Sequence, residues 1–179
     1  YLATVYSNSK YYAETWKEFN VKPSDITSWK DLRKIPTFDT RTLLARNAEF
    51  PAVPPAGLRR IMVSGGTTGN PKLCLWDNIR SVTEAWASTW KATQLTEEDV
   101  VTVMAPIPLA SGLHITEIVE EIGCTSLPVG HTTPPEFTAK LMLQLNATSI
   151  ISQPSTLGWF VEQIKRFNYH PKDFRLKSV

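Results

Sequence analysis

The chain contains 179 residues, of which 42% are hydrophobic and 20% charged, a composition typical of one packed globular domain. Its 19 basic and 17 acidic residues are interspersed and sum to a formal net charge of +2, so the charge pattern indicates neither a nucleic-acid-binding surface nor an acidic tail. No apolar run approaches the roughly 20 residues that a membrane-spanning helix requires, and the N-terminus lacks the pattern of a secretion signal.

Residues 1–59 predict a helical entry segment that ends in a proline-rich linker. Aromatic and apolar residues recur at three- and four-residue steps over residues 1–19 and predict an amphipathic helix. Ser28, and then Asp39 or Thr40, are placed to cap two short helices. The prolines between residues 51 and 55 favour an extended path across the surface.

Residues 60–179 predict an α/β nucleotide-binding core that is incomplete at its C-terminal end. Two short strands, Arg60–Val63 and Leu73–Trp76, flank a glycine-rich loop. Helices and strands then alternate, which favours a largely parallel sheet flanked by helices. The expected helices are 79–93, 113–122, 135–145 and 155–167, and the expected strands are 100–105, 125–129, 149–152 and the beginning of another at residue 176.

Trp86 and Trp90 lie four residues apart in the predicted helix after the loop, so they share one of its faces. They form either the aromatic wall of a pocket or a core-facing seam packed on the sheet. We favour the seam, because aromatic side chains are usually buried.

The glycine-rich loop combines residue types that bind phosphate groups. Its glycines can adopt positive φ, so successive backbone N–H groups can converge on an anion, while its hydroxyl and lysine side chains add donors and positive charge. The spacing is not that of a Walker A motif, because Pro71 precedes Lys72 and Leu73 follows it. A glycine-rich hairpin loop without a ligand is the alternative. The expected phosphate-binding residues are Ser64, Gly65, Gly66, Thr67, Thr68, Gly69 and Lys72.

The run Ser-Gly-Gly-Thr-Thr-Gly-Asn-Pro-Lys from Ser64 to Lys72 resembles the signature phosphate loop of the adenylate-forming superfamily, which includes acyl-CoA synthetases, luciferases and peptide-synthetase adenylation domains. Further stretches are similar to the phenylacetate-CoA ligase-like branch of that superfamily, namely residues 20–26, 29–43, 122–129 and 152–155. The resemblance implies that the α/β core is part of the N-terminal domain of an adenylate-forming enzyme. Because the resemblance reaches only part of a complete member, we expect a fragment or an excised domain.

The resemblance implies an AMP-forming acid–thiol ligase. ATP activates a carboxylic acid, which the branch leads us to expect to be aryl or arylacetic, as an acyl-adenylate, and the acyl group then passes to a thiol such as that of coenzyme A or of a carrier protein. Lys72 is the expected catalytic residue, because it would neutralise charge on the departing pyrophosphate, an effect worth ~3 kcal/mol per donor. The Mg²⁺ ligand and a second catalytic lysine are expected outside this chain, so the chain alone is expected to be inactive or nearly so.

A substrate pocket is expected at the carboxyl ends of the strands, where ligands bind in open α/β sheets. One turn contributes Ser111, Gly112 and His114, and another contributes Pro154 and Ser155. His114 contacts the acyl or phosphate group, or is a partly buried histidine bonded to a backbone carbonyl, which is the interpretation that we favour. Ser111 is expected to cap a helix.

Two other function classes stay open at this point. The chain is alternatively a non-catalytic nucleotide-binding or assembly module that retains the loop. A metal-free hydrolase that uses Ser111 and His114 is a more distant alternative, because no Gly-x-Ser-x-Gly elbow surrounds Ser111.

No metal site is expected within this chain. Cys74 and Cys124 are far apart and form neither a Cys-x-x-Cys motif nor a cluster with the histidines. We expect both thiols to be buried and reduced, which favours a cytoplasmic setting. The acidic runs 97–99 and 120–121 are expected to be solvated, as are His131 and His170.

Overall fold

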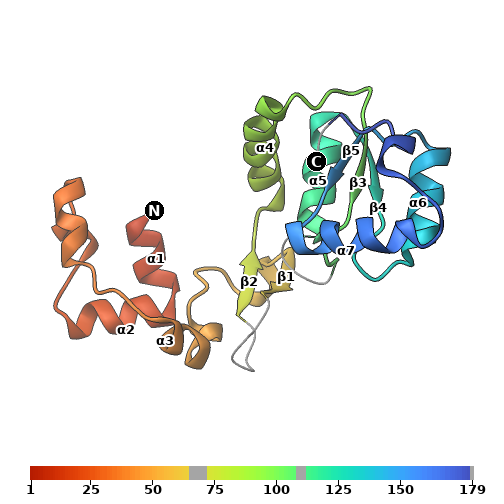
Figure 1. Ribbon diagram of the computed structural model, residues 1–179. Helices are drawn as coiled ribbons and strands as arrows, with labels where there is room; N and C mark the ends of the chain where they lie inside the picture. The colour runs from red at the N-terminus through yellow and green to blue at the C-terminus, as the bar shows by residue number, and fades with distance from the viewer. Residues whose placement is uncertain (65–71, 108–111, 178–179) are drawn as a thin grey trace. The chain divides into compact units, whose positions relative to one another are not determined.

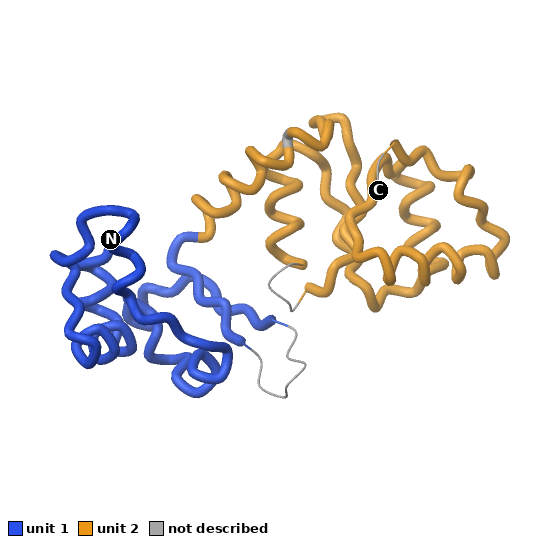
Figure 2. Tube along the Cα trace, turned by 60° about the vertical axis from the view of Figure 1, so that its left-hand side comes forward, with its two compact units in different colours: residues 1–78 blue, residues 79–179 orange. Residues whose placement is uncertain are grey.

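The computed structural model describes residues 1–64, 72–107 and 112–177, apart from the side chain of Lys91. The chain divides into two compact units, Tyr1–Asn78 and Ile79–Val179 (Figure 2). The first unit therefore includes the strands that flank the glycine-rich loop, which the sequence analysis grouped with the downstream core. No helix in the described ranges is long and apolar enough to cross a membrane.

The N-terminal segment contains two helices where the sequence predicted one. Helix α1 spans Leu2–Asn8 and helix α2 spans Lys10–Glu18. Ser9 separates them because it has extended backbone angles and its side chain accepts a hydrogen bond from the Tyr12 amide. An N-cap of this kind starts a new helix and so interrupts the expected continuous one.

The predicted caps of the two following helices are confirmed. Ser28 precedes the 3₁₀ helix Trp29–Lys34, and its amide and hydroxyl both donate to Asp31. Asp39 caps α3, which spans Thr40–Ala45, by accepting a hydrogen bond of 2.7 Å from the Thr42 amide. Further 3₁₀ turns in this unit are Pro23–Asp25, Asn47–Glu49 and Pro55–Gly57, the last of which adds regular structure to the proline-rich linker.

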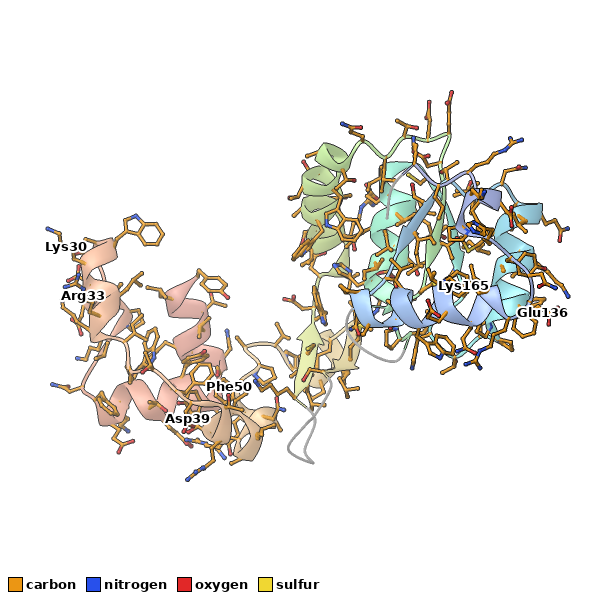
Figure 3. All side chains as sticks on the ribbon, in the orientation of Figure 1. Lys30, Arg33, Asp39, Phe50, Glu136 and Lys165 are labelled. Carbon is orange, nitrogen blue, oxygen red and sulfur yellow. The ribbon has the colours of Figure 1, made fainter. Side chains whose placement is uncertain are left out.

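An aromatic cluster packs the helical part of the first unit. Tyr11 stacks on Phe50 with ring centroids 4.0 Å apart, and Phe38 meets Phe50 edge-on at 4.7 Å. Phe50 is labelled in Figure 3. Arg46 lies over the Tyr11 ring at 5.0 Å, a cation–π contact.

The two predicted strands of the first unit are confirmed. Strands β1 (Arg60–Val63) and β2 (Leu73–Trp76) pair antiparallel, with Val63 opposite Leu73 at the end next to the loop. The loop between them, residues 65–71, lies outside the described residues. The hairpin therefore fixes both ends of the loop.

The second unit has the predicted α/β fold. Its helices are α4 (Ile79–Trp90), α5 (Gly112–Ile122), α6 (Pro135–Gln144) and α7 (Pro154–Lys165), and its 3₁₀ turns are Lys91–Thr93 and Pro171–Asp173. Strands β3 (Val100–Val103), β4 (Thr125–Pro128) and β5 (Ser149–Ile151) form a parallel sheet in the order β4-β3-β5. The largely parallel sheet is thus confirmed. No strand is assigned at residue 176 within the described range.

Helices cover both faces of the parallel sheet (Figure 1). On one face, Val101 and Val103 pack with Val119 of α5 and with Trp90 at the end of α4. On the other face, buried side chains of α6 and α7 pack with Met104 and Ile150. Burial on both faces explains why the central strand β3 reads as a continuous Val-Val-Thr-Val run.

The prediction that Trp86 and Trp90 both face the core is confirmed for Trp90 and wrong for Trp86. Trp90 packs against the core, but 50% of the Trp86 side chain is exposed. The buried residues of α4 are instead Thr83 and Ala87. These small residues allow close approach to α5, which leaves Trp86 at the margin of the contact.

Candidate functional site

The hairpin brings Ser64 and Lys72 together at the base of the predicted phosphate loop. The Ser64 amide donates a hydrogen bond of 3.0 Å to the Lys72 carbonyl, which extends the β1–β2 ladder by one position. This amide is therefore engaged in the hairpin, whereas the Ser64 hydroxyl and the Lys72 ammonium are side-chain donors at the loop base. Gly65, Gly66, Thr67, Thr68 and Gly69 lie outside the described residues.

Strand alternation sets the direction of these two side chains. Residues directly opposite each other in an antiparallel pair share a face, so Ser64 and Lys72 emerge on the face of Met62 and Cys74. Leu73 and Leu75 occupy the other face. There they line a cavity of about 390 Å³ within the first unit, together with residues that include Val5, Leu43 and Phe50. The side chains at the loop base thus emerge on the face of the hairpin opposite to this cavity.

The predicted substrate-pocket residues are in the second unit, at the carboxyl ends of β3 and β5. Gly112 is the first residue of α5, and Pro154 is the first residue of α7, with Gln153 as its N-cap. Since β3 and β5 are adjacent and parallel, both turns lie at the same edge of the sheet. Ser111 lies outside the described residues.

His114 is buried in the first turn of α5. Only 8% of its surface is exposed, and its Nδ1 lies 3.6 Å from Oε2 of Glu117, one helical turn later. This separation is longer than a hydrogen bond, but it places a carboxylate beside the ring. The burial agrees with the favoured interpretation, whose bond to a backbone carbonyl stays a prediction, while the neighbour Glu117 was not anticipated.

A surface depression of about 290 Å³ lies beside the first turn of α7. Ser155 and Thr156 line it from the helix, together with Trp159 and with His131 from the loop after β4. The sequence identified only Ser155. His131 was correctly expected to be exposed, but no role was given to it. Trp159 could have been predicted to line the same surface, because it lies four residues after Ser155 on the same helical face.

The loops that follow β3 and β4 contact each other at this edge. Gly130 has a positive φ of 67°, its amide donates to the Val103 carbonyl, and a Cβ built on it would lie 3.8 Å from Ile107. His131 follows directly. The turn at Gly130 therefore brings the loop of β4 onto the end of β3.

Asp99 is buried, although the acidic run 97–99 was expected to be solvated. It is 2% exposed, and its carboxylate accepts hydrogen bonds from the Thr96 amide, the Thr148 hydroxyl and the Lys177 ammonium at 2.6–2.8 Å. Burial alone would raise the pKa of Asp99, but these hydrogen bonds outweigh burial and lower its pKa to about 2. Asp99 is at the amino end of β3, opposite the candidate site, so we assign it a structural role.

The remaining titratable side chains give no metal site among the described residues, where no group of three or more potential ligands occurs. Both cysteines are free. Cys124 is buried as expected, and burial raises the pKa of its thiol, whereas Cys74 is only half-buried.

The sequence matches the family model described as "AMP-binding enzyme" over residues 4–179. The chain belongs to this family. It is 28% identical over 183 aligned positions to phenylacetate-coenzyme A ligase of Pseudomonas putida and 27% identical over 180 to that of Aromatoleum evansii. The alignments cover 98% and 96% of this chain but 41% and 40% of the relatives, so the chain spans about two fifths of their length.

Solved structures show the same fold. The open conformation of 2-hydroxyisobutyryl-CoA ligase with 2-HIB-AMP and CoA superposes with a TM-score of 0.86 at 18% identity, over 98% of this chain and 40% of that one. The thioesterification state of the same ligase gives 0.84 at 21% identity, over 98% and 39%. The resemblance to the adenylate-forming superfamily, and to its phenylacetate-CoA ligase-like branch, is confirmed by the family match and the curated relatives.

Proposed function

We propose that this chain provides the phosphate-loop portion of an AMP-forming acid–thiol ligase of the phenylacetate-CoA ligase type. The observation that carries the proposal is the Ser64–Lys72 motif at the end of the β1–β2 hairpin, inside a family match over residues 4–179. The names of the curated relatives support ligation of an acid to coenzyme A.

The proposed reaction has two steps. A carboxylate oxygen of an aryl or arylacetic acid attacks the α-phosphorus of ATP. The bond from the α-phosphorus to the oxygen that bridges to the β-phosphorus breaks, pyrophosphate departs, and an acyl-adenylate forms. The thiol of coenzyme A or of a carrier protein then attacks the acyl carbon, and AMP leaves with the bonding electron pair as the thiol proton is lost. Both substrates and products are small molecules or a carrier thiol, and no nucleic acid takes part.

The first step assigns roles to the loop base. Lys72 neutralises negative charge on the departing pyrophosphate, and the Ser64 hydroxyl, on the same face of the hairpin, donates to a phosphate oxygen. The amides and hydroxyls of Gly65, Gly66, Thr67, Thr68 and Gly69 are proposed to complete the contacts to the β- and γ-phosphates. The acyl group is proposed to lie near Ser111, Gly112, His114, Pro154 and Ser155.

Mg²⁺ is the metal that the family implies for a nucleotide substrate. No group of three or more potential metal ligands occurs among the described residues, and we propose that the carboxylate ligand of Mg²⁺ lies outside this chain. We therefore assign no step to Mg²⁺ in this chain. A cytoplasmic location is proposed with the activity, since ATP and coenzyme A are its substrates.

Carboxylate-dependent exchange of pyrophosphate into ATP tests the proposal. We expect no sustained exchange from the 179-residue chain alone, and exchange when it is mixed with the separately made C-terminal remainder of the Pseudomonas putida relative and an aryl acid. Lys72→Met is expected to lower that exchange by about 10²–10³, as for loss of one charge-stabilising donor. Lys30→Met, in the 3₁₀ helix Trp29–Lys34, is the matched control and should leave the rate unchanged.

Two outcomes separate the alternatives. Sustained exchange by the chain alone would show that it carries a complete catalytic site. The alternative outcome is saturable ATP binding without pyrophosphate exchange for every acid tested, in a mixture where the chain and the C-terminal remainder are shown to form a complex. That outcome would identify a nucleotide-binding module without turnover.

A further inference from the structure

The 3₁₀ helix Trp29–Lys34 is held in place by its own side chains and those just before it. The Asp31 carboxylate accepts hydrogen bonds of 2.8–3.1 Å from the amides and hydroxyls of Thr27 and Ser28. Lys34, one turn later, forms an ion pair of 2.7 Å with the same carboxylate. Hydrogen bonds from Lys34 and then from Ser28 lower the pKa of Asp31, so this carboxylate stays charged. Asp31 therefore links the start of the helix to its end and fixes the direction of its other edges.

One of these edges is apolar. Trp29 and Leu32 share it, because a 3₁₀ helix has about three residues per turn and side chains three residues apart lie above one another. Trp29 is 89% exposed and Leu32 is 39% exposed. Together with Ile26, Thr27 and Ser28 they line a surface depression of about 280 Å³. An exposed apolar patch on a fixed element is typical of a contact surface for another molecule.

The neighbouring edge is cationic. Lys30 and Arg33 are again three residues apart, and Figure 3 shows their side chains on the same side of the helix. Both are exposed, and neither has an ion pair among the residues that the structure describes. The third cation of the helix, Lys34, is neutralised by Asp31. The helix thus presents two unpaired positive charges beside its apolar edge.

We propose that this helix is the docking site for an acidic peptide segment of a protein partner, with apolar side chains of the segment beside Trp29 and its carboxylates at Lys30 and Arg33. Charge complementarity supports this occupant, since arginine matches the geometry of a carboxylate. Tryptophan and arginine are also the side chains that most often dominate binding energy at protein interfaces.

The spacing along the helix fits an extended segment. One turn of a 3₁₀ helix rises about 6 Å, close to the distance of about 6.6 Å between alternate residues of an extended peptide. A segment that alternates apolar and acidic residues, laid along the boundary between the two edges, directs its apolar side chains to Trp29 and its carboxylates to Lys30 and Arg33. Because Asp31 already fixes the helix, little of its conformational freedom is lost on binding.

A membrane surface fits these features less well. Recognition of anionic lipids typically uses clusters of about four to eight basic residues, whereas this helix has two unpaired cations. The depression beside Trp29 also favours a protruding side chain over a flat surface. The protein segment is therefore the occupant that the geometry favours.

Fluorescence anisotropy tests the proposal with a labelled peptide whose core, Leu-Glu-Leu-Glu, lies between Gly-Ser flanks. We expect saturable binding to the 179-residue chain, about tenfold or more tighter than that of peptides with Leu-Lys-Leu-Lys or Ser-Glu-Ser-Glu cores, because each of these lacks one half of the match. Trp29→Ala and Arg33→Glu are each expected to weaken binding of the Leu-Glu peptide by about tenfold or more.

Two matched controls accompany these variants. Trp159→Ala removes another partly exposed tryptophan, and Lys17→Glu reverses the charge of another exposed cation, so both should leave peptide binding unchanged. Trp29 and Arg33 are exposed, so their variants should keep the urea unfolding midpoint of the unsubstituted chain. The measurement needs neither ATP nor coenzyme A, so its result is independent of the proposed reaction.

Several outcomes would overturn the proposal. The absence of saturable binding of the Leu-Glu peptide, equal binding of the Leu-Lys peptide, or binding that survives both Trp29→Ala and Arg33→Glu would each do so. Binding of phosphatidylserine vesicles that depends on Trp29, without peptide binding, would assign the helix to a membrane surface instead. Self-association that Trp29→Ala abolishes, again without peptide binding, would assign it to a second copy of the chain.

Discussion

At Gly112 the backbone of α5 touches the peptide bond between Pro106 and Ile107. A Cβ built on Gly112 would overlap the Pro106 carbonyl and lie 2.7 Å from the Ile107 nitrogen, so a side chain would force backbone atoms apart. This contact places the first residue of the helix carrying His114 against residues 106–107, which follow β3. Gly112 is therefore a position where only glycine fits, a property that the sequence pattern alone did not reveal.

We expect Gly112→Ala to lower the free energy of unfolding by about 1–3 kcal/mol, as for overpacking of a closed contact. Gly158→Ala is the matched control, because nothing lies within 4 Å of a Cβ built there and α7 should gain about 0.5–1 kcal/mol from alanine. Urea unfolding of both variants measures the difference. Equal effects of the two substitutions would contradict the close approach at Gly112.

Asp99 makes stability depend on pH. Its pKa is about 2 in the folded chain and about 3.9 in an unfolded one, so folding favours the ionised form. The sign follows directly: the contribution, about 2–3 kcal/mol, is fully present above about pH 5 and is lost as the pH falls toward 2. Asp99→Asn should therefore destabilise the chain more at pH 6 than at pH 2.5.

Urea unfolding at several pH values checks this dependence, and Glu98→Gln, at an exposed neighbour, serves as the control. A destabilisation by Asp99→Asn that is constant across pH 2–6 would show that the charge of the Asp99 carboxylate does not contribute to stability.

The acidic run 97–99 illustrates a difference between residues that composition cannot resolve. Three adjacent acids look alike in sequence, but only Asp99 meets Lys177 and Thr148, both far away in the chain.

At the scale of single elements, the break at Ser9 shows how a local cap overrides periodicity. The apolar spacing of residues 1–19 is compatible with one helix, but Ser9 is 1% exposed, caps α2 through Tyr12 and donates to the Glu49 carbonyl at 3.1 Å. That last contact joins residues 40 positions apart, so no local pattern could predict it. Strand and helix positions in the second unit were predictable because alternation and periodicity are strong there.

Ser9→Ala should destabilise the first unit by about 1–2 kcal/mol through loss of the N-cap. Ser7→Ala, at an exposed position within α1, should change stability by less than about 0.5 kcal/mol. Tyrosine and tryptophan fluorescence during urea unfolding follows both variants. Identical stabilities would mean that the Ser9 contacts are energetically unimportant.

At the scale of the whole molecule, the two parts of the predicted site belong to different compact units. Ser64 and Lys72 are in the first unit, whereas His114 and Ser155 are in the second. The motif Ser64–Lys72 identified the family correctly because its glycines, hydroxyl side chains and lysine are close together in the sequence. The pocket residues were only partly predictable, since His131 and Trp159 reach the same depression through packing of separate loops and helices.

The most direct measurement of the central claim is a titration of the isotopically labelled chain with ATP, followed through the amide resonances. The account predicts saturable shifts concentrated on residues 65–72, weakened at least tenfold by Lys72→Met and not by Lys30→Met. Tripolyphosphate should reproduce these shifts, because the loop is proposed to contact the β- and γ-phosphates. Shifts that avoid the loop, or ATP binding that is unaffected by Lys72→Met, would contradict the account.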